Sequence, residues 1–203
     1  MIDSYDALDL GTFLKIDAVL RTDADDLDKQ AQIIAILSDK SLDEVLSLSL
    51  GDYASMAAQT AFLKELCKPA EIPDGYEYEG LRPVEDFTKL TAAQYIDFQT
   101  FSKHFPETIP ELLTVLLVPD GHRYNDGYDI APLLEAVKKM PLATALGLTA
   151  FFFSRCAKSI DASLTFLDGV AKRTKDAKVL QRIVNLTREV RELLPSAGAG
   201  STG

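Results

Sequence analysis

The sequence has few of the residues on which active sites most often depend. Its 203 residues include two cysteines, two histidines and no tryptophan. Cys67 and Cys156 are isolated, and neither lies in a Cys-x-x-Cys pair, so their spacing predicts neither a disulfide framework nor a zinc site. Because His104 and His122 are the only imidazoles, a histidine-based reaction would have to use one of them.

The motifs of common enzymes are also absent. The chain has no Gly-x-Ser-x-Gly nucleophile turn, no phosphate-binding loop ending in Gly-Lys-Ser or Gly-Lys-Thr, and no His-Glu-x-x-His. The sequence therefore predicts a protein that is not an enzyme and that has no metal, no cofactor and no catalytic residues.

The loop from Pro119 to Asp129 leaves one catalytic alternative open. It carries His122 and three aspartates that could gather around a metal ion: Asp120, Asp126 and Asp129. The simpler interpretation is that its Asp and Gly residues form turns, while Tyr124 and Tyr128 anchor the loop on the core.

No stretch of the chain is apolar for long enough to suggest a membrane span. The longest uncharged run, Met140 to Ser154, has 15 residues, whereas a span needs about 18 to 20. The acidic start, Met1 to Asp6, lacks the cationic region of a signal peptide. We expect a buried core helix at residues 140–154 and a cytoplasmic protein.

The net charge of −10 is unevenly distributed. Residues 1–90 hold 19 acidic and 8 basic side chains, whereas residues 171–203 hold 3 acidic and 7 basic ones. An acidic body disfavours nucleic acid as a partner, because phosphate binding needs clustered Lys and Arg. The distribution favours contact between the basic C-terminal segment and an acidic protein surface, including that of a second copy.

Hydrophobic periodicity predicts a mainly α fold. We expect one helical domain over residues 1–170 with a small β-hairpin near residues 76–88, then a C-terminal amphipathic helix over 171–195 and a flexible tail over 196–203. Residues 8–20 fit a short strand or a helix. Further helices are expected at residues 25–38, 41–48, 51–69, 91–103, 111–117, 131–139 and 141–160.

Local signals place several helix starts. Ser41 with Glu44, and Thr91 with Gln94, match capping boxes. In the helix over residues 25–38, Leu27 and Ala31 are expected on the buried face. Tyr95, Phe98 and Phe101 are expected to point inward from the helix over residues 91–103.

Two apolar features suggest partner binding. Phe151, Phe152 and Phe153 place aromatics on three sides of a helix, which fits a core helix or a groove for a partner's helix, formed with the helix over residues 91–103. The spacing 4, 3, 4, 3 in the last helix predicts a seam that packs on the chain's own core or on a partner. The candidate partner-binding residues are Tyr95, Phe98, Phe152, Val179, Ile183, Leu186, Val190 and Leu193.

Over residues 8 to 155 the chain resembles tail assembly chaperones of long-tailed bacteriophages, especially those of Bacteroides-type hosts. The resemblance rests on four segments: Leu10-Gly11-Thr12-Phe13-Leu14-Lys15-Ile16, Leu90-Thr91-Ala92-Ala93-Gln94-Tyr95-Ile96-Asp97, Leu116-Leu117-Val118-Pro119-Asp120-Gly121 followed by Tyr124, and Phe151-Phe152-Phe153.

The resemblance implies a helical protein that binds the long, helical tape-measure protein in the host cytoplasm during tail assembly and is then released. It supplies no catalytic residues. Two alternatives remain: a structural subunit of the virion, such as a connector or tail-completion protein, and a small metal-dependent enzyme using the loop at residues 119–129. The expected partner is a protein with long apolar-faced helices, with a homo-oligomer as a further option.

Overall fold

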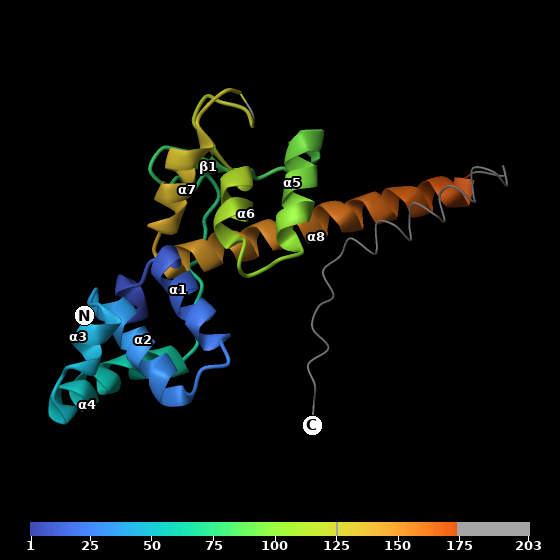
Figure 1. Ribbon diagram of the computed structural model, residues 1–203. Coiled ribbons are helices and arrows are strands. Elements are labelled where there is room, and N and C mark those ends of the chain that lie inside the picture. The colour runs from blue at the N-terminus through green and yellow to red at the C-terminus, as the bar shows by residue number, and fades with distance from the viewer. Residues whose placement is uncertain (125, 174–203) are drawn as a thin grey trace. The chain divides into compact units, whose positions relative to one another are not determined.

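A computed structural model describes residues 1–124 and 126–173 of the chain, with side chains up to Ser159 (Figure 1). The described part is mainly helical with one two-stranded antiparallel sheet, which confirms the predicted fold class. The sequence predicts one body over residues 1–170, whereas the structure divides into two compact units. Of the described residues, the first comprises 1–84 and 91–150 without residue 125, and the second comprises 85–90 and 151–173.

The first unit begins with a 3-10 helix and four α-helices, and a polar side chain caps the N-terminus of each α-helix. A short 3-10 helix, η1 (Tyr5–Ala7), precedes α1 (Leu10–Leu20), α2 (Asp26–Ser38), α3 (Leu42–Leu46) and α4 (Leu50–Gln59). Residues 8–20 form a helix rather than a strand, because the Asp9 carboxylate accepts the backbone N–H of Thr12 at 2.6 Å and caps α1. Asp25, Ser41 and Ser49 cap the next three helices in the same way.

A small apolar cluster holds α2 to α3 and α4. Ala31, Ile34 and Ala35 of α2 pack with Val45 of α3, and four partly buried side chains cover them: Leu48, Tyr53, Met56 and Ala57. Leu27 was expected on this face, but it is exposed because the cluster begins at Ala31, one turn further along α2.

The helix predicted to run to Pro69 ends early. α4 stops at Gln59 and continues as a tighter 3-10 helix, η2 (Thr60–Lys64). The Thr60 hydroxyl donates to the Ala57 carbonyl at 2.8 Å, a bond that competes with the regular helical pattern. The Tyr5 hydroxyl donates to the Glu65 carbonyl at 2.7 Å and ties the end of η2 to η1.

The sheet of the first unit joins segments that are far apart in sequence. β1 (Leu81–Pro83) pairs antiparallel with β2 (Leu117–Pro119), with Arg82 opposite Val118. A tight turn leads into β1, where Glu79 and Gly80 both have positive φ and Tyr78 exchanges two backbone hydrogen bonds with Leu81. Two consecutive residues with positive φ make this the two-residue turn that suits hairpins. The predicted strand is therefore present, and its long-range partner is the segment that directly follows α6.

α6 (Ile109–Leu116) is the central helix of this part of the unit and lies between α5 (Ala92–Ser102) and α7 (Ile130–Lys138) in Figure 1. It is buried along most of its length, from Ile109 and Pro110 through Leu112 to Leu116. α5 opens with the predicted capping box of Thr91 and Gln94. The buried Gln94 amide also donates to the Val115 carbonyl at 2.8 Å, so it joins the start of α5 to α6.

α8 (Leu142–Arg173) begins in the first unit and continues into the second. Its first residues pack closely on the chain before them: Leu142 donates its N–H to the Leu8 carbonyl at 2.8 Å. The backbone of Gly147 lies against the Ala70 carbonyl, where a Cβ would overlap the oxygen. Ala70 in turn donates its N–H to the Ala143 carbonyl at 2.8 Å.

The second unit contains the short helix η3 (Phe87–Lys89) and α8 from Phe151 onward. Phe152 is fully buried, and its ring packs on Phe87 with 6.4 Å between ring centroids. The Arg155 guanidinium lies over the ring of Phe151 at 4.9 Å. The predicted seam over Val179 to Leu193 and the tail over 196–203 lie outside the described residues.

Candidate protein-binding surface

Two of the residues predicted to bind a partner are core residues. Phe98 and Phe152 are both almost completely buried. Phe98 follows Gln94 by one helical turn, so it shares the face of α5 that packs on α6. Burial of Phe98 agrees with the expectation that it points inward, and burial of Phe152 agrees with the core-helix alternative, so neither ring is open to a partner in this structure.

α5 also has an outer face. Tyr95 is exposed rather than inward, and Ile96 beside it is 61% exposed. The Tyr95 hydroxyl accepts a long hydrogen bond of 3.4 Å from the Gln99 amide. This face retains one predicted residue, Tyr95, as a candidate contact.

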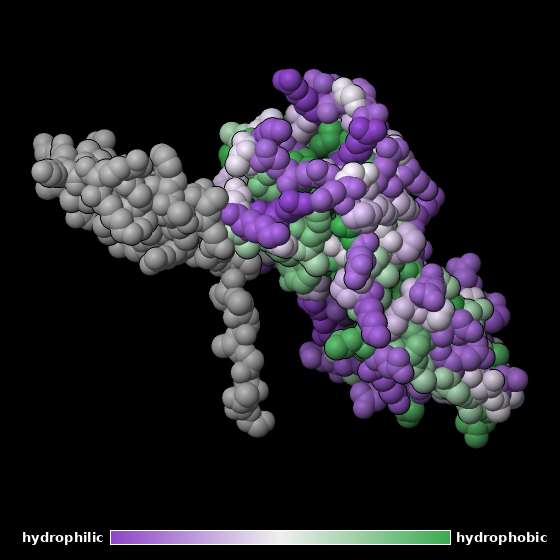
Figure 2. Space-filling view, turned by 180° about the vertical axis from the view of Figure 1, so that it is seen from behind, coloured by the Kyte–Doolittle hydropathy of each residue, from purple (hydrophilic) through white to green (hydrophobic). Residues whose placement is uncertain are grey.

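Most of the exposed large aliphatic side chains lie on the N-terminal helices and the segment after them. Six leucines of these segments are exposed: Leu20, Leu27, Leu42, Leu46, Leu50 and Leu66. Figure 2 shows hydrophobic groups isolated within a largely hydrophilic surface. Sequence periodicity does not predict this exposure, because a leucine in a helical pattern is ordinarily assigned to the core.

We call three of these side chains the leucine face: Leu42 and Leu46 of α3, and Leu50, the first residue of the next helix, α4. They are 40%, 63% and 84% exposed. Leu42 and Leu46 are one turn apart and therefore lie on the same side of α3. Val45 occupies the buried side of this five-residue helix. A helix this short can bury only one side, so its leucines remain in solvent.

Carboxylates flank the leucine face. Residues 41–63 contain Asp43, Glu44 and Asp52 but no Lys or Arg. Glu44 accepts hydrogen bonds from both the backbone N–H and the hydroxyl of Ser41, each at 2.8 Å, and these bonds hold the pKa of Glu44 below its ordinary value. Asp52 accepts the Ser49 hydroxyl at 2.6 Å. The face is therefore apolar and bordered by fixed negative charge.

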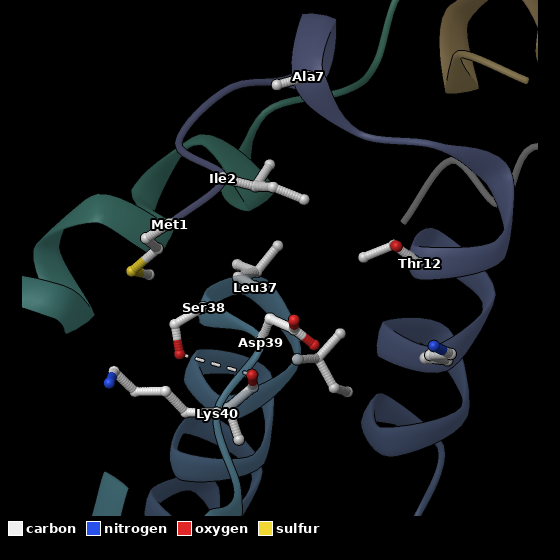
Figure 3. Close-up of a pocket in the computed structure, with 11 residues that line it drawn as sticks. Met1, Ile2, Ala7, Thr12, Leu37, Ser38, Asp39 and Lys40 are labelled. Atoms are coloured by element: carbon white, nitrogen blue, oxygen red, sulfur yellow. Dashed lines mark hydrogen bonds between the residues drawn. The ribbon is translucent and has the colours of Figure 1, made fainter. Parts of the chain in front are cut away.

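A cavity of about 610 Å³ opens between the N-terminal segment, α1 and the end of α2 (Figure 3). Its lining includes Ile2, Thr12, Lys15, Leu37 and Asp39. Asp39 has φ of 53° and ends α2, while Lys40 donates its N–H to the Ala35 carbonyl at 3.1 Å. The lining contains ammonium, hydroxyl and carboxylate groups but neither imidazole nor thiol.

The aspartates of the loop over residues 119–129 have structural partners. Asp120 lies 3.4 Å from the Arg82 guanidinium, Asp126 accepts the backbone N–H of Arg123 at 3.4 Å, and Asp129 caps α7 by accepting the N–H of Ala131 at 3.0 Å. Among the described residues, no three His, Cys, Asp or Glu side chains are grouped to hold a metal ion. The loop geometry thus gives the metal-enzyme alternative no support.

Tyr124 anchors this loop, as the sequence suggested. Its hydroxyl donates to the Asp97 carboxylate of α5 at 2.6 Å. Burial raises the pKa of Tyr124 well above its ordinary value, and the hydrogen bond and negative charge of Asp97 raise it further. The phenol therefore stays protonated and keeps the loop fastened to α5.

The two cysteines are free thiols, and Cys156 is buried. Burial raises the pKa of both Cys67 and Cys156, which disfavours the reactive thiolate. None of the helices in the described part of the chain combines the length and hydropathy that a membrane span requires.

The leucine face is therefore the feature of the described residues that best fits a binding site, and neither the cavity nor the loop offers a comparable chemical case. Comparison of the chain with known protein families, with curated proteins and with solved structures gives no match.

Proposed function

We propose that this protein is a non-enzymatic chaperone that binds an apolar-faced helix of another protein and keeps it soluble. The resemblance in sequence suggests the setting: tail assembly in a long-tailed bacteriophage, with the tape-measure protein as the client, in the host cytoplasm. The observation that carries the proposal is the leucine face, three exposed leucines bordered by carboxylates on α3 and α4.

Burial of these leucines supplies the driving force. Covering an exposed leucine side chain contributes about 1.5–3 kcal/mol. An amphipathic helix laid along α3 would cover apolar atoms of Leu42 and Leu46, which lie on the same side of that helix. Part of the gain is offset by the entropy lost on association, so the surface suits a client that is bound and later released.

The charges specify the client further. With Asp43, Glu44 and Asp52 beside the leucines and no basic side chain in residues 41–63, a helix with Lys or Arg along its apolar stripe is favoured over an acidic one. The net charge of −10 also keeps a loaded complex from aggregating through self-repulsion.

Co-expression with the candidate client tests the proposal. The wild-type protein should raise the soluble fraction of the tape-measure protein, and Leu46→Glu should abolish this effect, because it places a charge in the centre of the apolar contact. Ile96→Glu is the matched control: Ile96 on α5 is 61% exposed and Leu46 is 63% exposed, so both variants should remain folded.

The outcomes separate the alternatives. Loss of client solubility in Ile96→Glu alone would move the binding site to the outer face of α5. A wild-type protein that leaves the client insoluble and is present stoichiometrically in purified particles would replace the chaperone by a structural subunit of the virion.

A further inference from the structure

The leucine face and the C-terminal segment have opposite charge and matching apolar spacing. The segment over residues 171–203 carries seven basic and three acidic side chains. Within it Val179 and Ile183 are four residues apart, as Leu42 and Leu46 are on α3. Lys175 and Arg182 lie next to this apolar series on the heptad repeat.

From this complementarity we propose that residues 175–193 of a second copy occupy the leucine face, so that the chain associates with itself head to tail. The proposal rests on the function proposed above, because it assigns a competing occupant to the same surface. Each copy supplies one acidic apolar face and one basic apolar segment, and hence both halves of the contact.

Charge decides against the symmetric arrangement of two leucine faces. Such a pairing would bring Asp43, Glu44 and Asp52 of one copy against the same carboxylates of the other. Residues 41–63 hold no basic side chain, and Lys40, whose charge acts on Glu44, offsets only part of this repulsion. Like charges placed opposite one another across an interface oppose association. The basic segment removes this repulsion and covers the same leucines.

The arrangement has a regulatory consequence. A heterologous contact of this kind closes into a ring or extends as a chain, and it releases its surface when the protein is diluted or when a tighter ligand competes. Self-association would therefore keep the leucines covered in the absence of client. A client helix that binds more tightly would displace the segment and disperse the assembly.

A photo-crosslinking experiment on the full chain tests the contact. A benzophenone amino acid replaces Leu46, and chains of natural isotope content are mixed with ¹⁵N-labelled chains before irradiation. The expected result is a crosslink from position 46 to a peptide within residues 174–194. It should join an unlabelled chain to a ¹⁵N-labelled chain. Crosslinks within one chain only, to position 46 of a second copy, or to other segments would overturn the proposal.

Charge exchange gives an independent test. Asp43→Arg and Arg182→Glu should each weaken self-association about three- to tenfold in sedimentation velocity, because each removes one attractive charge and adds a repulsive one. The double variant should recover the wild-type value. Asp23→Arg, an exposed charge reversal outside α3 and α4, should have no effect. A coiled coil between two C-terminal segments would instead make Asp43→Arg silent, and the proposal would fail.

The same variants separate this inference from the proposed function. Arg182→Glu should disperse the assembly while leaving client solubility equal or higher. If Leu46→Glu abolishes client solubility but crosslinks never reach residues 174–194, the chaperone function stands and self-occupation falls. If the crosslink is found but no client is solubilised, self-occupation of the leucine face stands and the chaperone function falls.

Discussion

The Gln94 side chain stabilises two neighbouring helices through the two ends of its amide group. Its amide oxygen accepts the Thr91 N–H at 3.4 Å and completes the capping box, while its amide nitrogen donates to the buried Val115 carbonyl at 2.8 Å. Only a side chain with both an acceptor and a donor satisfies the two neighbours. Glu44 occupies the equivalent position of the other capping box, but it is exposed and has no such carbonyl to satisfy.

We predict that Gln94→Glu destabilises the protein by about 2–4 kcal/mol, because it buries a carboxylate against a carbonyl oxygen and leaves that oxygen without a donor. The reciprocal change, Glu44→Gln, should cost less than about 1 kcal/mol, since glutamine also completes a capping box. Urea unfolding of both variants measures the difference. Equal losses would show that the bond to Val115 contributes little.

Ionisation of Tyr124 should lower the free energy of unfolding at alkaline pH. Its pKa is raised in the folded protein, so the unfolded chain ionises first as the pH rises above about 10. The stability that this residue contributes is thus fully present below that pH and declines above it. We expect Tyr124→Phe to lower the melting temperature at neutral pH.

The same variant should lose less stability than the wild type between neutral pH and strongly alkaline pH. Thermal melts at both pH values check this, and ultraviolet titration of the tyrosines identifies the group that ionises late. Parallel pH profiles for the two proteins would contradict the role given to the hydrogen bond with Asp97.

At the scale of the helices, two glycines provide a matched comparison. A Cβ at Gly147 in α8 would overlap the Ala70 carbonyl oxygen, which is backbone and cannot swing away. A Cβ at Gly51 in α4 would meet only the Ser49 hydroxyl, at 3.9 Å.

We predict that Gly147→Ala destabilises the protein by about 1–3 kcal/mol through overpacking. Gly51→Ala should stabilise it by about 0.5–1 kcal/mol, since alanine is the better helix former. Differential scanning calorimetry of the two variants tests the pair. A neutral Gly147→Ala would mean that the segment around Ala70 moves aside readily.

The helices were predictable wherever a local signal marks their ends. The capping residues Ser41 and Thr91 predicted two helix starts correctly, because a cap acts within four residues. Residues 8–20 stayed ambiguous between strand and helix, and the change to a 3-10 helix at Thr60 was missed. Both depend on single hydrogen bonds, to Asp9 and from Thr60, which compete with alternatives of similar energy.

Long-range features were harder to foresee. Nothing in the local pattern of Leu81–Pro83 indicates that its partner strand is Leu117–Pro119. For the same reason the exposure of apolar residues was not predicted: Phe98 and Phe152 are buried, whereas the leucines of α3 and α4 remain exposed. Periodicity identifies an apolar face but does not reveal whether the chain covers that face itself.

At the scale of the whole molecule, charge distribution is the clearest property. Residues 1–90 hold 19 acidic and 8 basic side chains, and the excess of basic ones is confined to residues 171–203. The acidic part repels polyanions, and the basic segment carries too few charges to bind them well against that repulsion.

We therefore predict no measurable binding of single- or double-stranded DNA at about 100 mM salt. Fluorescence anisotropy with labelled oligonucleotides provides the measurement, and a protein truncated after Arg173 serves as the control for the basic segment. Micromolar binding that disappears on truncation would show that this segment acts on nucleic acid rather than on a protein surface.

The pairing of β1 with β2 also bears on the order in which the chain folds. Bringing Leu81 to Pro119 closes a loop of nearly forty residues, at an entropic cost of about 3 kcal/mol for a flexible chain. α5 and α6 form within that loop from local contacts and shorten the distance to be closed. The strands should therefore meet only after these helices have docked. Changes at the Gln94–Val115 bond would then slow folding, whereas changes in the exposed strand residue Arg82 would mainly speed unfolding.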